Sequence, residues 1–553
     1  MTEPTNGTPD DAPDRTPDDA TREIPHGQTA PIPSSYAYPA PPPASETAAP
    51  SAAEAAPVGV PLTDEPTPRE RKRTGLVIGS VAALAVLGTG GVLAFNALSG
   101  GGSQPAEVLP SDAYFYVRLD IDPSAGQKIA AVRFLNKIPE VKQLESGDAR
   151  KTLWELVTKE ADDDCVSKFA YDADIAPWLG ERAGLAVRPG GTADMPNVAL
   201  ALQVTDEGKA SDTLTRLFAC DDGEKPDLRM KDGYALITPK GKGDDLVAAI
   251  GKGTLAGNAN FTSDMGDLGE EGVLSMWADI SPMAKDATNL APDAAPPGVS
   301  PSDAQGRFAA ALRFDPAFVE LAGISRGVKG AGTAMPAPGG DSTELGRLPE
   351  DTMIAAHVAH GDQMLATAWP ELEKQLNDLG AAEGEEDMIG LIEDQFGLTL
   401  PDDLEAILGS SFTVALPGQD FAQDVPTLGA KVVSKDAARA EEVLTDIEDL
   451  AGSSLLTKEV DGDRLYVATT PDYLSRLKTD GTLGDSDAFK AALGDVSKSQ
   501  VAFYLDLDKL EKLYLEEASG DARTALEALR AAGLSVSATG AGEASFSLRV
   551  VGN

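Results

Sequence analysis

The sequence predicts an α+β protein with three zones: a disordered N-terminal tail, one transmembrane helix and an exported region of two duplicated halves. A proline-rich start, a long uncharged apolar stretch and sequence blocks that recur at a nearly constant offset predict these zones. Each exported half is expected to contain mostly antiparallel sheet with helices packed on one face.

Composition excludes several classes of protein. The 553 residues include 89 acidic and 46 basic ones, which gives a formal net charge of −43. Nucleic-acid binding requires a basic surface, so no nucleic-acid partner is expected. Two cysteines are too few for cysteine-rich zinc modules, and three histidines provide few candidates for histidine-based catalysis.

The tail, residues 1–74, contains 16 of the 39 prolines and only scattered large apolar residues. Such a segment buries too little apolar surface to offset the entropy of ordering it, so we expect it to be disordered. Thr8, Thr16 and Thr67 each precede a proline, which suggests a cytoplasmic Ser/Thr kinase as a partner of the tail.

Residues 75–98 form an uncharged apolar run that is long enough to span a bilayer as a helix. Arg69, Arg71, Lys72 and Arg73 lie directly before it, whereas an uncharged segment follows it. The positive-inside rule therefore predicts a single-pass protein of the plasma membrane with a cytoplasmic N-terminus and an extracytoplasmic C-terminal region. The alternative is a cleaved signal peptide, which usually has a much shorter leading segment.

After a linker at 99–108, the exported region is expected to repeat itself, with one half at 109–330, a linker at 331–347 and a second half at 348–553. The offset between matching blocks is 239 at first and 227–230 afterwards. Five pairs of positions mark the matching blocks: Leu109 with Leu348, Trp178 with Ile407, Pro196 with Pro426, Gly253 with Gly481, and Asp279 with Asp506.

The first half is expected to begin with a strand and to alternate strands with helices. Runs rich in aliphatic and aromatic residues predict strands, and Ala210, Leu214 and Leu217 have the spacing of one helix face. The expected strands are 113–119, 183–187, 198–204 and 234–238, and the expected helices are 127–138, 151–160 and 208–218.

Cys165 and Cys220 both lie in the first exported half. Thiols outside the cytosol are able to oxidise, so a disulfide between them is predicted, with two separate buried thiols as the alternative.

Motifs for catalysis, cofactors or metals are weak. Ser325 lies in a G-x-S-x-G pattern, but a helix-like segment at 315–322 precedes it, so we interpret the pattern as a helix-ending turn. His357 and His360 are three positions apart in an alternating strand pattern, which places them on opposite faces and disfavours a shared metal.

Acidic pairs are common in the exported region. Asp120 and Asp122 would share a strand face and could hold a hard cation, but a solvated acidic surface is the favoured interpretation. No catalytic, cofactor-binding or metal-binding residue is therefore predicted.

The segments Asp122-Pro123, Gly126-Gln127-Lys128 and Trp178-Leu179-Gly180, together with the order of tail, cationic stop and span, resemble the actinobacterial DUF3352 single-pass membrane proteins. This is a domain of unknown function. The resemblance implies a location in the cell envelope and a non-enzymatic protein, and it supplies no cofactor or catalytic residue.

These observations favour a membrane-anchored extracytoplasmic binding or scaffolding protein. Its expected partners are the bilayer, through 75–98, and an envelope protein or a wall polymer. The alternatives are an extracellular hydrolase acting on wall or peptide material, or a signalling subunit with a phosphorylatable tail.

Overall fold

The computed structural model describes most of residues 103–553. The expected tail at 1–74, the expected span at 75–98 and the cationic residues Arg69, Arg71, Lys72 and Arg73 lie outside the described residues. No helix within the described part is long and apolar enough to cross a membrane. The remaining gaps are at 122, 136–147, 149, 152–153, 156–157, 159–164, 193–194, 221–222, 291–303, 330–337, 384–386, 420, 422–424, 453, 516–517 and 541.

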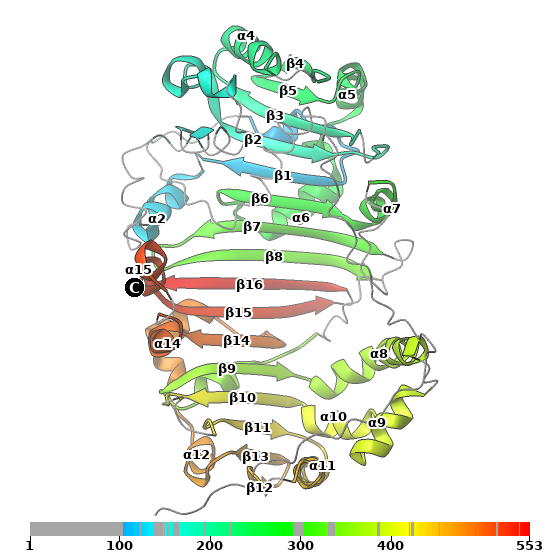
Figure 1. Cartoon of the computed structure of the whole chain (residues 1–553), viewed down its shortest axis with the longest axis vertical. Helices are drawn as coiled ribbons and strands as arrows, with labels where there is room; N and C mark the ends of the chain where they lie inside the picture. Colours follow the sequence, from blue (N-terminus) through cyan, green and yellow to red (C-terminus); the bar gives the residue numbers. More distant parts are fainter. Residues whose placement is uncertain are drawn as a thin grey trace, which may run out of the picture. The chain divides into compact units, whose positions relative to one another are not determined.

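The described strands form one antiparallel sheet of 16 strands, which Figure 1 shows face-on. The strands of the first half are β1 (Phe115–Asp120), β2 (Leu179–Val187), β3 (Val198–Val204), β4 (Asp227–Lys231), β5 (Tyr234–Thr238), β6 (Leu274–Asp279), β7 (Gln305–Phe314) and β8 (Phe318–Lys329). Those of the second half are β9 (Thr352–Ala359), β10 (Ser411–Pro417), β11 (Gly429–Val433), β12 (Thr457–Asp461), β13 (Arg464–Ala468), β14 (Val501–Asp506), β15 (Leu529–Gly540) and β16 (Glu543–Gly552).

The two halves of the sheet have the same strand order. From its outer edge to the centre, the first half reads β4-β5-β3-β2-β1-β6-β7-β8, and the second reads β12-β13-β11-β10-β9-β14-β15-β16. Equivalent positions make equivalent hydrogen bonds: the Leu255 amide donates to the Leu109 carbonyl at 2.8 Å, and the Leu483 amide donates to that of Leu348 at 3.1 Å. The halves meet where β8 pairs with β16.

Helices cover both faces of the sheet, so the expectation of helices on one face is wrong. Strand β5 shows why, because its side chains alternate between two cores: Tyr234 and Leu236 belong to one, and Ala235 and Ile237 to the other. A strand that is buried on both faces is apolar throughout, and its sequence does not tell which face a helix covers.

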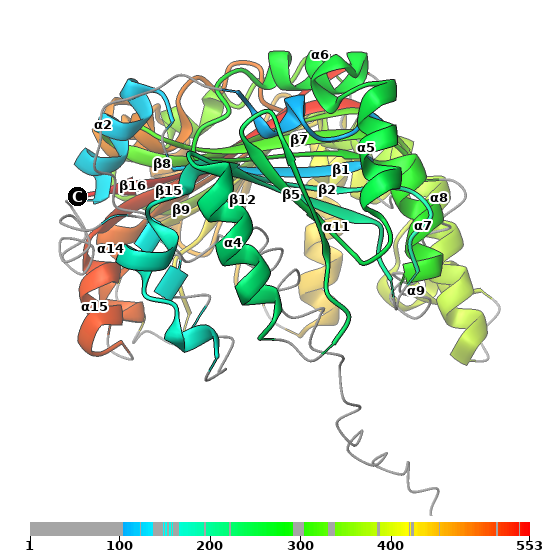
Figure 2. The same ribbon diagram turned by 90° about the horizontal axis from the view of Figure 1, so that it is seen from above.

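We call the face that carries Tyr234 and Leu236 face 1, and the opposite one face 2. Helices α5 (Gly243–Lys252), α6 (Ala259–Leu268), α12 (Pro471–Leu477) and α13 (Asp487–Leu493) pack on face 1. Helices α2 (Ala125–Leu135), α4 (Glu207–Phe218), α10 (Asp402–Leu408) and α11 (Ala437–Leu450) pack on face 2. Figure 2 shows α6 on one side of the sheet and α4 and α11 on the other.

The other helices are α7 (Ile280–Leu290), α8 (Gly361–Glu383), α9 (Met388–Phe396), α14 (Leu507–Tyr514) and α15 (Gly520–Glu527). Short helical turns are η1 (Pro105–Glu107), η3 (Val166–Lys168), η4 (Tyr171–Ile175), η5 (Leu255–Gly257), η6 (Thr343–Arg347) and η7 (Leu483–Asp485). Within the expected linkers, Val108 and Leu345 are buried core residues.

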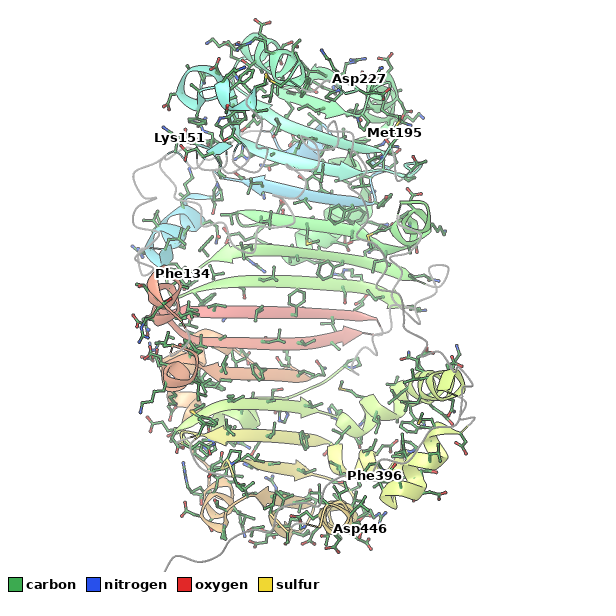
Figure 3. The ribbon with its side chains drawn as sticks, viewed as in Figure 1. Phe134, Lys151, Met195, Asp227, Phe396 and Asp446 are labelled. Atoms are coloured by element: carbon green, nitrogen blue, oxygen red, sulfur yellow. A yellow bond between two sulfur atoms is a disulfide. The ribbon has the colours of Figure 1, made fainter. Side chains whose placement is uncertain are left out.

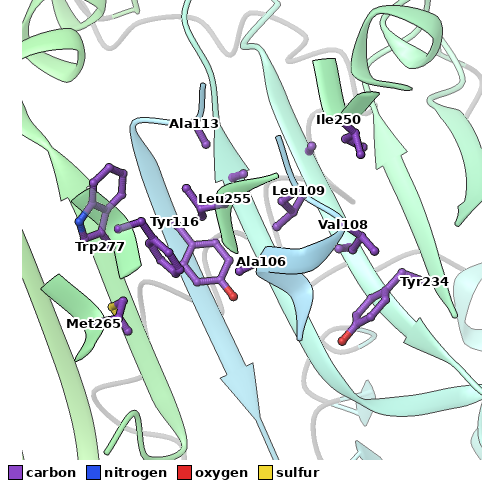
Figure 4. Packing of buried hydrophobic residues seen from close by; sticks show 14 of the residues in the cluster. Ala106, Val108, Leu109, Ala113, Tyr116, Tyr234, Ile250, Leu255, Met265 and Trp277 are labelled. Atoms are coloured by element: carbon purple, nitrogen blue, oxygen red, sulfur yellow. The ribbon is translucent and has the colours of Figure 1, made fainter. Parts of the chain in front are cut away.

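Aromatic residues fill the face 1 core of the first half. The Phe261 ring lies edge-on to Tyr116 at 5.4 Å and to Trp277 at 5.7 Å, between ring centroids. Figure 4 shows Tyr116 and Trp277 in this cluster with Leu109 and Leu255. The equivalent core of the second half contains Phe489 and Tyr504, 5.1 Å apart.

The outer edges of the sheet are the five-residue strands β4 and β12, which carry charged side chains such as Asp227, labelled in Figure 3, and Glu459. Short charged edges disfavour pairing with another strand.

Candidate functional site

A polar hollow lies on face 1, where the two halves meet. Two adjoining open hollows of about 570 Å³ and about 230 Å³ share Asp267 at the end of α6. The smaller one is floored by strands β8, β16 and β15. We call the two hollows together the inter-half groove.

Four serines line the floor of the groove. Ser535 lies opposite Ser547, and Ser537 lies opposite Ser545, across the β15–β16 pair. Serines two positions apart in a strand point to the same face, so the four hydroxyls form one patch. Ser547 donates to Glu320 at 2.7 Å, and the Ser537 hydroxyl lies 3.3 Å from that of Ser499.

One end of the groove is built around Asp264, which is 1% exposed. Its carboxylate accepts hydrogen bonds from Trp277 Nε1 at 2.9 Å and from Arg307 Nε at 2.6 Å. The Arg326 Nε lies 3.4 Å from the same carboxylate, and Arg326 also pairs with Asp267. The buried carboxylate thus fixes two guanidinium groups at the rim of the groove.

Asp279 lines the same end of the groove. Burial raises the pKa of its carboxyl group, although a hydrogen bond from the backbone of Ser281 and the charge of Arg307 act in the opposite direction. A carboxyl group with a raised pKa in a hollow is a candidate for binding or proton transfer.

The other end of the groove carries Glu320, Arg313 and Arg549. Arg549 Nε donates to Glu320 at 3.0 Å, and Arg313 Nε lies 3.4 Å from it. Burial alone would raise the pKa of Glu320, but hydrogen bonds from Ser547 and Arg549 hold it below its usual value. Arg549 also stacks over Phe318, 4.4 Å from the ring centroid.

Within the described residues, the Asp264 cluster has no counterpart in the second half. Asp279 pairs with Arg307 across β6–β7, whereas its equivalent Asp506 pairs with Ala531 across β14–β15. The offset of 228 that relates Leu255 to Leu483 relates Asp264 to Ala492. Polar groups present in one half of a repeated fold are not required by the fold itself, which favours a functional role for this cluster.

Ser325 lies inside strand β8, so the expected helix-ending turn is wrong. Its hydroxyl oxygen is buried without a hydrogen-bond partner among the described residues, although the residue as a whole is half-buried. The segment 315–322, expected to be helix-like, is not a helix: residues 318–322 pair with β7 and β16 and form part of a strand.

His357 lies in β9 and His360 directly follows it, both in the second half. His357 is buried with Nδ1 2.9 Å from Thr413 Oγ1, and His360 Nε2 lies 3.1 Å from the Gly339 carbonyl oxygen. No group of three or more potential metal ligands occurs in the described part of the chain.

Burial lowers the pKa of His357, although a backbone contact with Asp341 and the charges of Glu344 and Asp341 act in the opposite direction. The unfolded chain therefore binds a proton more readily than the folded one below the ordinary pKa of about 6.5. The contribution of neutral His357 to stability is complete above about pH 6.5, and it is lost as the pH falls through the pKa that His357 has in the folded protein.

We expect His357→Gln to make the free energy of unfolding less dependent on pH below about 6.5. Urea unfolding at a series of pH values measures this effect, with His360→Gln as the control. Identical slopes in the wild type and His357→Gln would contradict the assignment.

Asp120 is not part of a solvated acidic surface or a cation site. It is 1% exposed, pairs with Arg118, and accepts a hydrogen bond from Arg182 Nε at 2.9 Å. Arg118 also pairs with Glu271 at 2.9 Å. Asp122 lies outside the described residues.

The predicted disulfide is confirmed. Cys165 and Cys220 are bonded, with their Cα atoms 5.5 Å apart, and the bond joins the start of η3 to the end of α4. Both elements pack in the face 2 core of the first half.

The residues of the inter-half groove were not identified in the sequence. The two Ser-x-Ser patterns at 535–537 and 545–547 are the signal that was available, because alternate serines on one face of a strand leave that face polar. Arg307 and Asp264 are 43 positions apart, and the sequence offers no local signal for their pairing.

Comparison with known proteins locates one family. Residues 76–262 match a family described as "Protein of unknown function (DUF3352)". No curated protein and no solved structure matches the chain. The matched range ends within α6, so β15 and β16 of the groove lie beyond it.

Proposed function

We propose that the chain is a membrane-tethered binding protein of the cell envelope, and that its exported region holds an extended peptide segment in the inter-half groove. The observation that carries this proposal is the serine patch at the junction of the two halves, with a charged cluster at each end.

The spacing of the serines suits a peptide. Residues two apart in a strand repeat about every 6.6 Å, which is also the repeat of an extended peptide that lies along the strands. A serine hydroxyl both donates and accepts hydrogen bonds, so the patch is able to pair with amide and carbonyl groups alike.

Each end of the groove carries both positively and negatively charged residues, so it is able to pair with ligand side chains of either charge. Arg307 and Arg326 lie at one end with Asp267 and Asp279, and Arg549 lies at the other end with Glu320. Complementary charges at the ends of a groove favour one register and one orientation of a bound segment.

The proposed tether is the uncharged run at 75–98, with Arg69 to Arg73 on its cytoplasmic side. The Cys165–Cys220 bond supports an oxidising compartment for the exported region. The common strand order of the halves supports an origin by duplication. With this topology the tail lies in the cytoplasm, where it is a proposed substrate of a Ser/Thr kinase.

Hydrolysis of wall or peptide material is the second candidate. Asp267 and Asp279 line the same hollow, and Asp279 has a raised pKa. Asp264, the buried carboxylate beside them, is held by Arg307, which favours binding over proton transfer. Cleavage of bound peptides that stops in Asp279→Asn would support hydrolysis.

The binding proposal is tested by panning a random phage-displayed peptide library against the full chain in lipid nanodiscs. Ser545→Arg would fill the groove with a long cationic side chain, so we expect selected peptides to bind it at least tenfold more weakly, about 1.4 kcal/mol. Fluorescence anisotropy of labelled peptides measures the change.

The matched control is Ser475→Arg, the same substitution at an exposed serine of α12. It is expected to bind the selected peptides as the wild type does. Equal binding by Ser545→Arg and the wild type, or binding of wall polysaccharide in the groove without any selected peptide, would contradict the proposal.

A further inference from the structure

The inter-half groove changes charge along β16, the strand that pairs with β8 at the centre of the sheet (Figure 1). Residues two positions apart in a strand share a face, so Glu543, Ser545, Ser547 and Arg549 all lie on face 1. This row begins with a carboxylate, continues with two hydroxyls and ends with a guanidinium group. At about 3.3 Å per residue, its two charged ends lie about 20 Å apart.

At the Glu543 end, one guanidinium group is shared among three carboxylates. Arg326 pairs with Asp267, and it lies 3.4 Å from Asp264 and 3.6 Å from Glu543. The other guanidinium group, that of Arg307, is engaged by Asp264 through hydrogen bonds of 2.6 Å from Nε and 3.2 Å from Nη2. Among the described residues, Asp267 and Glu543 therefore have no cation apart from the shared Arg326.

Asp279 adds a further carboxylate to this end, where it lines the larger hollow. Burial raises the pKa of its carboxyl group, and Arg307 and Lys285 are the cations that act in the opposite direction. Arg307 is already engaged by Asp264, and Lys285 does not line the hollow. With Lys285 included, four carboxylates face three cations, so one negative charge remains in excess.

The end at Arg549 has the opposite balance. Glu320 lies between two guanidinium groups, 3.0 Å from Arg549 Nε and 3.4 Å from Arg313 Nε. Arg313 lines the smaller hollow; Asp267 lines it too but is paired with Arg326. One positive charge therefore remains in excess at this end, beside a side chain that lines the hollow.

This distribution of charge matches an extended peptide with one charged side chain near each end. Residues six positions apart in an extended chain are about 20 Å apart and point to the same face, as Glu543 and Arg549 do. A basic side chain complements the Glu543 end, and an acidic one complements the Arg549 end. The hydroxyls of Ser545 and Ser547 are uncharged, so they favour no charge at the positions between.

We propose that the inter-half groove selects peptide segments that carry a basic and an acidic side chain six positions apart. The basic side chain lies at Glu543 and Asp279, and the acidic one lies at Arg313. This inference rests on the proposed peptide site and adds the charge and the spacing of its ligand.

The test uses the full chain in lipid nanodiscs and pools of heptapeptides with capped ends, an uncharged coumarin label and five varied uncharged residues in the middle. The first and last residues are lysine and glutamate, in either order, or two lysines, or two glutamates. Fluorescence anisotropy is expected to show about fivefold tighter binding of the lysine–glutamate pools than of both like-charged pools. Lysine and glutamate placed two positions apart should lose this advantage.

Glu543→Lys reverses the charge of one end, at a side chain that is 42% exposed. The pool with two glutamates is expected to bind this variant about fivefold more tightly than it binds the wild type. A gain of binding cannot result from loss of the fold. Glu442→Lys is the matched control, because Glu442 is 64% exposed on α11 and pairs with Arg439 at 2.9 Å. This control should keep the preference of the wild type.

Two kinds of failure are distinguishable. Peptides that bind the wild type, lose binding in Ser545→Arg and show no preference among the charged pools would overturn this inference and leave the peptide site standing. Binding of the two-glutamate pool that is equal in Glu543→Lys and Glu442→Lys would overturn it as well. If neither the pools nor the selected peptides bind the wild type, both the inference and the proposed function are overturned.

Discussion

Asp264→Ala is expected to lower the free energy of unfolding by about 3–5 kcal/mol, the range for removing one partner of a buried ion pair. The substitution leaves the indole N–H of Trp277 without its acceptor and leaves Arg307 without its carboxylate. Because the side chains of Arg307 and Arg326 are 26% and 30% exposed, water partly solvates them, and we expect a value near the lower end.

Urea unfolding followed by circular dichroism measures this change. The control is Asp267→Ala, whose carboxylate is 52% exposed and pairs with the same Arg326. A surface pair contributes about 0–1 kcal/mol, so this variant should unfold nearly as the wild type does. Equal destabilisation by the two substitutions would contradict a central role for Asp264.

The double variant Cys165→Ser/Cys220→Ser is expected to lower the free energy of unfolding by about 4 kcal/mol, from the entropy of the loop that the bond closes. The two cysteines are 55 positions apart. The loss should be local, because η3 and α4 pack in the first half and the second half has no cysteine.

Limited proteolysis with and without reductant locates the effect. Cleavage near η3 and α4 should accelerate in the double variant, and also in the reduced wild type, whereas cleavage in α11, the equivalent helix of the second half, should not change. Unchanged stability on reduction, or cleavage that accelerates equally at α11, would contradict the local role of the bond.

Elements with strong local patterns could be predicted from the sequence. The strands expected at 198–204 and 234–238 are β3 and β5 with the same bounds, and the helix expected at 208–218 is α4 within one residue. An apolar run or a helical spacing is visible among residues that are close together in the sequence, so these elements could be recognised without knowledge of distant contacts. In the helix expected at 151–160, the described residues 151, 154, 155 and 158 are helical, and the other positions lie outside the described residues.

Strand β8 could not be predicted, because its structure depends on distant partners. The spacing of Phe318, Leu321 and Ala322 suits a helix, but β7 and the remote β16 supply hydrogen bonds on both sides. The same pairing joins the two halves into one sheet. For this reason the sequence predicts repeated blocks but not the continuous sheet that carries the inter-half groove.

The candidate site was missed for the same physical reason. Ser545 and Ser537 come together only through the register of β15 and β16, and Glu320 and Arg549 only through the β8–β16 pair. The Cys165–Cys220 bond could be predicted because the chain has two cysteines and the region that contains them was expected to lie outside the cytosol.

Protease treatment of cell-wall-free protoplasts tests the central claim most directly, with antibodies against residues 1–74 and against residues 348–553. The account predicts that the region after residue 98 is digested in intact protoplasts while the tail is protected until lysis. If both parts are protected until the membrane is opened, the proposed tether, compartment and binding role are contradicted.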